Sequence, residues 1–161
     1  MTTPMTTASR KTRLWILSLF CAVCLTAVLS ADTVQADTEI YTTITGDQLK
    51  EIVASEGYTD ITVDEDDDLI FKMEGTNVLL LTSSDKESIQ FYVAWAGTDA
   101  NMRGVNDWNK TKKYSRAYID DDGDPVLELD LDLEGGVTRE RIVSFITTFR
   151  VSLNAFRDEV L

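Results

Sequence analysis

The spacing of hydrophobic residues along the chain predicts three helices. One begins at a capping box formed by Thr45 and Gln48, continues with apolar residues at helical spacing and ends near Gly57. A shorter helix is predicted over residues 103–112, with one face that would carry Met102, Val105, Trp108 and Asn109. The last begins after the N-cap Thr138 and carries an apolar stripe along its whole length. The stripe consists of Ile142, Phe145, Ile146, Phe149, Leu153, Phe156 and Val160.

Between these helices, β-branched and aromatic runs separated by turn residues predict an antiparallel sheet. Its strands are expected at residues 69–74, 77–83, 88–95, 115–120 and 126–133, and residues 58–63 are expected to be extended. The run Val78–Leu81 predicts a strand buried on both faces, and Asp122-Gly123 is typical of a hairpin turn. The expected fold class is α+β, a small antiparallel sheet with helices packed on one face, in the order α-β-β-β-α-β-β-α.

The strand at residues 126–133 alternates most clearly, with leucines expected toward the core and carboxylates toward water. The carboxylates are Glu128, Asp130, Asp132 and Glu134. Such a row can keep the surface soluble, dock a basic partner or perform acid/base chemistry. We rank these interpretations in that order, because the sequence shows no apolar pocket that would raise the pKa of one carboxyl group.

The N-terminal segment has a different pattern from the rest. Three basic residues within positions 10–13 precede an uncharged apolar run from Leu14 to Leu29. A basic start and a short apolar run are typical of a secretory signal peptide, since a membrane span needs about 20 apolar residues. Small residues at Val34 and Ala36 predict cleavage after Ala36. We therefore expect a signal peptide at 1–36 and a periplasmic or secreted domain at 37–161, with an uncleaved N-terminal anchor as the alternative.

Composition restricts the functions that remain. The chain has 28 acidic and 15 basic residues and a net charge of -13, which disfavours nucleic acid and anionic membrane surfaces. It has no histidine, the commonest general base and zinc ligand, and its two cysteines, Cys21 and Cys24, lie in the predicted signal peptide. We expect no enzymatic activity, no cofactor, no nucleic-acid partner and no stable membrane association after cleavage.

Four short stretches form a specific set, although each alone is a weak signal. They are Val105–Asn109, Tyr114–Tyr118, Asp121–Glu128 and Gly135–Thr138. Together they resemble the YbjN family of bacterial proteins, and the order of predicted elements upstream agrees. The resemblance implies a fold similar to type III secretion chaperones, modules that often dimerise and bind protein partners. Family members are commonly described as sensory transduction regulators, and the family offers no catalytic residues. The predicted export departs from many members.

A group around the predicted short helix is the candidate partner or ligand groove. Its members are Asn106, Trp108, Asn109, Arg116 and Tyr118. The structural alternative, which we favour, is that the indole anchors the helix in the core and the asparagines hydrogen-bond neighbouring loops. The cations beside this group are expected to pair with nearby carboxylates. These cations are Lys110, Lys112, Lys113 and Arg116.

A second acidic group surrounds the predicted hairpin turn. Asp120, Asp122 and Asp124 resemble the start of a calcium loop, but Leu131 stands where the bidentate glutamate would be required. We interpret them as turn residues and expect no metal. The sequence thus predicts an exported, non-catalytic interaction module of the bacterial envelope, chaperone-like or regulatory, with a protein partner and a candidate homodimer. The alternative is a small-molecule or divalent-metal-binding sensor domain.

Overall fold

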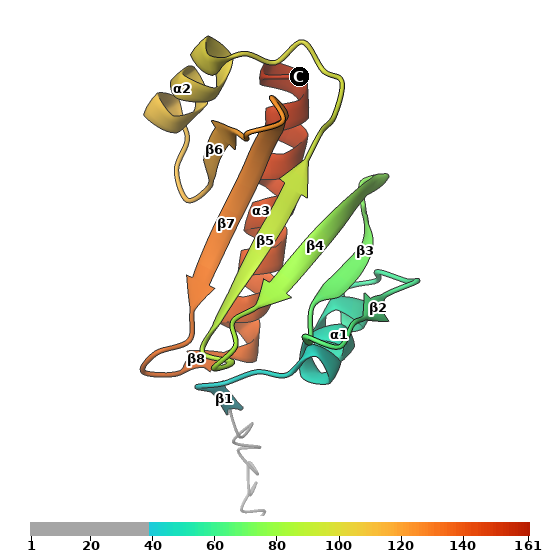
Figure 1. Cartoon of the computed structure of the whole chain (residues 1–161). Coiled ribbons are helices and arrows are strands. Elements are labelled where there is room, and N and C mark those ends of the chain that lie inside the picture. Colours follow the sequence, from blue (N-terminus) through green and yellow to red (C-terminus); the bar gives the residue numbers. More distant parts are fainter. Residues whose placement is uncertain (1–38) are drawn as a thin grey trace, which may run out of the picture. The chain divides into compact units, whose positions relative to one another are not determined.

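The computed structural model describes residues 39–161, so the predicted signal peptide and its cleavage site lie outside the described residues. Figure 1 shows the helices and strands. In chain order they are β1 (Ile40–Tyr41), α1 (Gly46–Ser55), β2 (Thr62–Val63), β3 (Leu69–Met73), β4 (Thr76–Thr82), β5 (Ser88–Ala94), α2 (Met102–Thr111), β6 (Arg116–Ile119), β7 (Pro125–Asp132), β8 (Val137–Thr138) and α3 (Arg139–Glu159).

The main sheet has six strands in the order β2-β3-β4-β5-β7-β6, and every neighbouring pair is antiparallel. The predicted fold class, α+β with an antiparallel sheet, is confirmed. The predicted order of helices and main strands is found as well, with β1, β2 and β8 as additional two-residue strands. β1 and β8 pair with each other in a separate small sheet.

Local sequence signals explain where the elements begin and end. Thr45 and Gln48 form the predicted capping box at the start of α1, and Thr138 caps α3 by accepting a hydrogen bond from a backbone N–H in its first turn. Glu74 and Gly75, between β3 and β4, both have positive φ (50° and 80°). That pair of values is typical of a type I′ turn, whose twist matches the strands that it joins.

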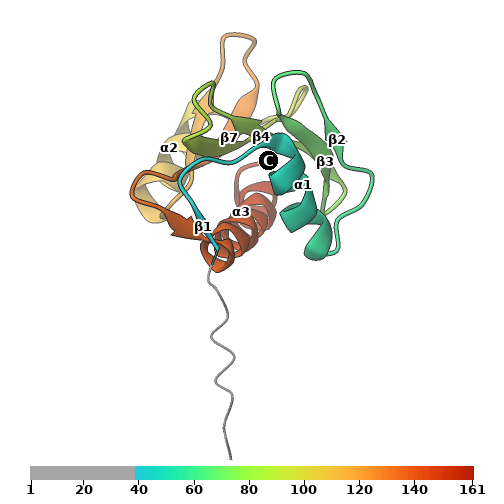
Figure 2. The same ribbon diagram turned by 90° about the horizontal axis from the view of Figure 1, so that it is seen from below.

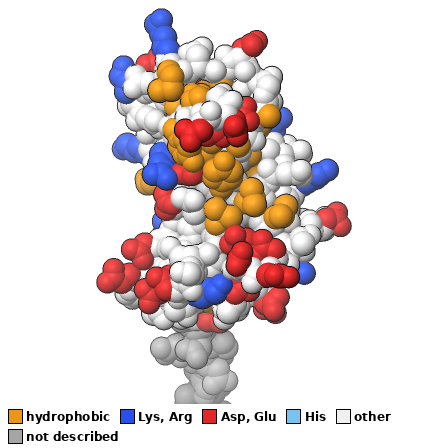
Figure 3. Space-filling view, viewed as in Figure 1, with side chains coloured by type: hydrophobic (Ala, Val, Ile, Leu, Met, Phe, Trp, Pro, Cys, Tyr) orange, Lys and Arg blue, Asp and Glu red, His pale blue; other side chains and the backbone are white. Residues whose placement is uncertain are grey.

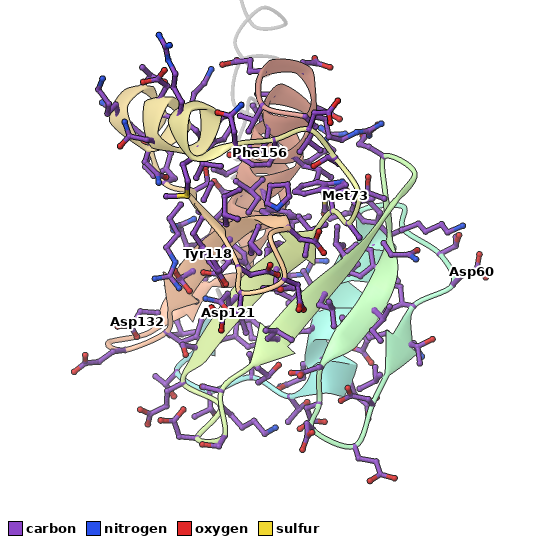
Figure 4. All side chains as sticks on the ribbon, turned by 45° about the horizontal axis from the view of Figure 1, so that its top comes forward. Asp60, Met73, Tyr118, Asp121, Asp132 and Phe156 are labelled. Carbon is purple, nitrogen blue, oxygen red and sulfur yellow. The ribbon has the colours of Figure 1, made fainter. Side chains whose placement is uncertain are left out.

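The hydrophobic core lies between one face of the six-stranded sheet and the helices α1 and α3. Figure 2 shows both helices on the same side of the strands, and α2 beside the β7–β6 end of the sheet. Phe91 of β5 is at the centre, stacked on Phe149 at 4.2 Å and on Phe145 at 5.1 Å between ring centroids. Phe156, near the end of α3, contacts Trp95 and Trp108 and so joins α2 to the core (Figure 4).

Two expectations about burial are wrong. Val78 and Leu80 of β4 are buried, but Leu79 and Leu81 are only half-buried, because no helix among residues 39–161 covers the other face of the sheet. Met102 does not share the buried face of α2 with Val105 and Trp108 but is 67% exposed at the start of that helix. Within residues 39–161, no helix is both long enough and apolar enough to cross a membrane.

Candidate functional site

The face of the six-stranded sheet opposite α1 and α3, which we call the open face, carries one continuous row of side chains. The register places Ile70 opposite Leu79, Leu79 opposite Tyr92, Tyr92 opposite Glu128, and Glu128 opposite Arg116. Directly opposed residues in antiparallel strands present their side chains to the same face. The row therefore crosses five strands, from β3 to β6, and changes from aliphatic to aromatic to charged.

The aliphatic and aromatic part of the row is accessible. Ile70 is 41% exposed and Tyr118, beside the row on β6, is 37% exposed, while Leu79, Leu81 and Tyr92 are half-buried. Figure 3 views this face and shows hydrophobic side chains gathered over the strands, with carboxylates around them. A contiguous apolar surface with a polar border is typical of sites that bind another molecule.

The charged end of the row is a compact cluster rather than an exposed acidic strip. The expectation that Glu128 faces water with the other β7 carboxylates is wrong, because this residue is only 4% exposed. Its Oε2 accepts a hydrogen bond from Arg116 Nε at 2.6 Å and forms an ion pair with Arg116 Nη2 at 2.5 Å. The Tyr118 hydroxyl donates to its Oε1 at 2.8 Å. A buried carboxylate needs such partners, since desolvation without compensation is costly.

The neighbours of this cluster fix its protonation. Burial, followed by the hydrogen bond to Glu128, raises the pKa of Tyr118 to about 12. Burial, followed by the charge of Asp120, raises the pKa of Tyr92. The hydrogen bond to Glu128 raises the pKa of Arg116 further above its usual value. Both phenols stay neutral and the guanidinium stays charged near neutral pH, so the cluster offers fixed charge and hydrogen-bond donors.

The structure does not gather the five predicted groove residues into one groove. Trp108 is buried, with its ring edge-on to Phe156 at 5.1 Å, and its Nε1 has no hydrogen-bond partner among the described residues. Asn109 joins α2 to β6, since its Nδ2 donates to the Ala117 carbonyl at 2.8 Å and its Oδ1 accepts from the Ala117 N–H at 2.9 Å. Asn106 is exposed on α2. Only Arg116 and Tyr118 lie on the open face.

The cations near α2 pair with carboxylates, as expected. Lys110 lies 3.6 Å from Asp107, and Lys112 lies 2.5 Å from Glu159 of α3. With the Arg116–Glu128 pair, these contacts engage three of the four cations of this group. The small basic cluster therefore neutralises local acid rather than forming a basic patch.

The acidic turn between β6 and β7 has a structural role. Asp120 Oδ1 accepts hydrogen bonds from the backbone N–H groups of Asp122 at 3.0 Å and Asp124 at 2.8 Å. Gly123 has a φ of 88°, which an L-residue rarely adopts. Across residues 39–161, no three carboxylate, thiol or imidazole side chains are grouped in a way that could hold a metal ion. The geometry supports the interpretation of this segment as a turn.

The alternation within residues 88–95 indicates that Tyr92 and Phe91 lie on opposite faces of the strand, but it does not indicate that Tyr92 lies beside Glu128. Leu79 and Ile70 were missed as surface residues, because a continuous aliphatic run gives no period that separates one face from the other. The alternation of β7 identified the face of Glu128 correctly. Only the strand register shows that Arg116 and Tyr118 of β6 cover it.

Comparison with known proteins agrees with the fold. The family model YbjN, described as "Putative bacterial sensory transduction regulator", matches residues 45–161. The crystal structure of E. coli YbjN, described as "a putative transcription regulator", has 17% identity and a TM-score of 0.54, covering 76% of this chain and 99% of that chain. The Yersinia pestis type III secretion chaperone SycH, solved with a stable fragment of YscM2, has 16% identity and a TM-score of 0.49, covering 65% and 95%. No curated protein matches.

The family match begins at the N-cap of α1 and runs through the end of α3, so it includes α1, α2, α3 and all six strands of the main sheet within the described residues. The resemblance inferred from the four sequence stretches is confirmed. The chain belongs to the YbjN family.

Proposed function

We propose that this protein is an exported, non-catalytic interaction module of the bacterial envelope, which binds a protein partner on the open face. The observation that carries the proposal is the row from Ile70 through Leu79 and Tyr92 to the Glu128 cluster, which no element among residues 39–161 covers. The family description as a sensory transduction regulator supports a regulatory role of this kind.

The chemistry of the open face favours a protein over a small molecule. Small ligands bind mainly in concave pockets, whereas protein interfaces combine an apolar centre with a polar border. Aromatic residues and arginine dominate the binding energy of such interfaces, and Tyr92, Tyr118 and Arg116 lie together here. Arg116 and Tyr118 are also held in place by Glu128, so less conformational entropy is lost on binding.

Export is supported by the sequence. A basic start and a short apolar run precede the family domain, and the domain contains no cysteine, which suits an oxidising compartment. We place the mature protein in the periplasm or outside the cell. N-terminal sequencing of protein recovered from the periplasmic fraction tests this directly: a start at Asp37 supports cleavage after Ala36, and an intact N-terminus in the membrane fraction contradicts it.

Site-specific photo-crosslinking tests the binding face. A photoreactive amino acid replaces Leu79 on the open face or Lys50 on the exposed side of α1, and the full-length chain is expressed in a bacterium that exports it. We expect a discrete crosslinked adduct from position 79 and none from position 50. Equal adducts from both positions, or none from position 79, would contradict the proposal.

A matched pair of variants separates binding from nonspecific adhesion. Ile70→Lys places a charge in the aliphatic part of the open face, and Val151→Lys makes the same change at an exposed apolar residue of α3. We expect Ile70→Lys to remove most of the adduct from position 79 and Val151→Lys to leave it. Loss of the adduct in both variants would mean that exposed hydrophobicity alone, not this face, causes the contact.

A further inference from the structure

The outer edge of β7 is only half covered. β5 pairs with β7 along residues 126–132, but β6 pairs only with residues 125–128. Residues 129–132 therefore have no strand on their outer side among the described elements. β6 begins late because the chain reaches it from α2 through Tyr114, whose φ of 74° is left-handed backbone, and through Ser115. An unpaired strand edge is a template for the addition of another strand.

The direction of the free backbone groups follows from two hydrogen bonds. The Trp95 N–H donates to the Pro125 carbonyl at 3.2 Å, and the Leu133 N–H donates to the Glu87 carbonyl at 2.9 Å. Odd-numbered residues of β7 therefore direct their backbone groups toward β5. Because these groups alternate along a strand, Asp130 and Asp132 direct theirs to the outer edge, where a further strand could pair with them.

A cavity lies beside this free edge, between β7 and α3. Its volume is about 320 Å³, and its lining combines core side chains with polar side chains of α3. The lining residues are Tyr114, Leu129, Asp130, Arg141, Ser144, Phe145 and Thr148. Tyr114, 81% exposed, lies at the end from which β6 starts. A strand added in line with β6 would therefore have space for alternate side chains between β7 and α3.

The carboxylates beside this edge determine which kind of strand can pair with it. Asp130 and Asp132 are exposed on the side of β7 that faces the open face, and Asp132 points away from the sheet in Figure 4. If two copies paired at this edge, these carboxylates would meet their own counterparts, and like charges on opposed strands are destabilising. A segment with lysine or arginine at alternate positions would instead place cations beside both carboxylates.

We propose that the free edge of β7 binds an extended, basic segment of the protein partner by β-strand addition. The backbone of the segment pairs with Asp130 and Asp132, its basic side chains lie on the open face, and its intervening apolar side chains enter the cavity beside Leu129 and Phe145. This inference rests on the proposed function, because it names the chemistry of the partner and extends its contact from the open face to the adjoining edge.

The test uses a capped seven-residue peptide that alternates lysine and valine, titrated into the ¹⁵N-labelled protein. We expect hydrogen exchange of the Asp130 and Asp132 amides to slow on binding. A peptide of the same composition with lysines and valines in separate blocks, and one with glutamate in place of lysine, should bind at least tenfold more weakly. Equal binding of the block peptide would overturn strand addition, because it would show that charge alone is recognised.

Two double variants locate the site. Asp130→Asn with Asp132→Asn should weaken peptide binding about tenfold, whereas Asp121→Asn with Asp122→Asn removes the same charge from an exposed turn and should change binding less than twofold. Protection of amides elsewhere, or formation of a homodimer that excludes the peptide, would overturn the proposal. If the position-79 crosslink forms but the Asp130→Asn, Asp132→Asn variant binds the peptide normally, this inference fails and the proposed function stands. If no crosslink forms at position 79 but the peptide still binds at the edge of β7, the proposed function fails and strand addition stands.

Discussion

Removal of the Arg116 side chain should leave the buried Glu128 carboxylate without its cation. Glu128 has a side chain 5% exposed, whereas the side chain of Arg116 is 64% exposed. An exposed ion pair contributes about 0–1 kcal/mol, and removing one partner of a fully buried pair costs about 3–5 kcal/mol. This pair is buried on one side only, so we expect Arg116→Ala to lower the free energy of unfolding by about 2 kcal/mol, which corresponds to about 8 °C in Tm for a domain of this size.

Urea unfolding followed by tryptophan fluorescence measures this loss. The matched control is Arg103→Ala, because Arg103 lies 3.9 Å from Asp107 with its side chain 92% exposed and should contribute less than about 0.5 kcal/mol. In a Glu128→Gln background, Arg116→Ala should cost about 1 kcal/mol less than in the natural sequence, since no buried charge is then left unpaired. Equal losses for both arginines, or no dependence on the Glu128→Gln change, would refute the reasoning.

Four further substitutions test other parts of the domain. Asn109→Ala should lower the free energy of unfolding by about 2 kcal/mol and speed hydrogen exchange of the Ala117 amide, because the N–H and the carbonyl of Ala117 both lose a hydrogen-bond partner. An unchanged exchange rate would contradict the assigned contact. Gly104→Ala should stabilise the protein by about 0.5–1 kcal/mol, because alanine favours a helix and the added Cβ would meet only a side chain at 3.6 Å. Gly46→Ala should destabilise the protein, because the added Cβ would lie 2.8 Å from a backbone oxygen. Equal effects of the two substitutions in thermal unfolding would argue against this packing. Burial and hydrogen bonding raise the pKa of Tyr118 from 10.0 to about 12, so its stabilising contribution is complete below pH 10 and is lost as the pH rises through about 12. Tyr118→Phe should remove this part of the loss of stability at alkaline pH. If the free energy of unfolding of the variant and of the natural sequence fell in parallel with pH, this assignment would be refuted.

Local signals made much of the fold predictable from sequence. The capping box at Thr45, the N-cap at Thr138 and the position of strand β7 are encoded within a few residues, and the structure has each of them close to where the sequence predicts it. The two-residue strands β1 and β8 could not be predicted, because two residues show no period and their pairing joins opposite ends of the domain.

The candidate site was less predictable, because it depends on strand register. Nothing in the local sequence indicates that Arg116 lies opposite Glu128 or that Tyr92 adjoins them from β5. The burial of Glu128 follows from those neighbours and not from its own strand, whose pattern placed it with Asp130 on a solvated face. In the same way, Trp108 and Asn109 were identified as important, but only the structure shows that they hold α2 against the core and β6.

The β1–β8 pairing has a consequence for folding kinetics. Ile40 pairs with Thr138, about 100 positions later in the chain. The chain between them must therefore lose conformational entropy before this contact can stabilise the fold. The pairing is also tight, since a Cβ at Gly136 would lie 2.5 Å from Ile40 Cγ2. A chain that emerges N-terminus first therefore presents β1 early and its partner nearly last. Protection of the Tyr41 amide should then be among the final events of folding, and its rate would report completion of the domain.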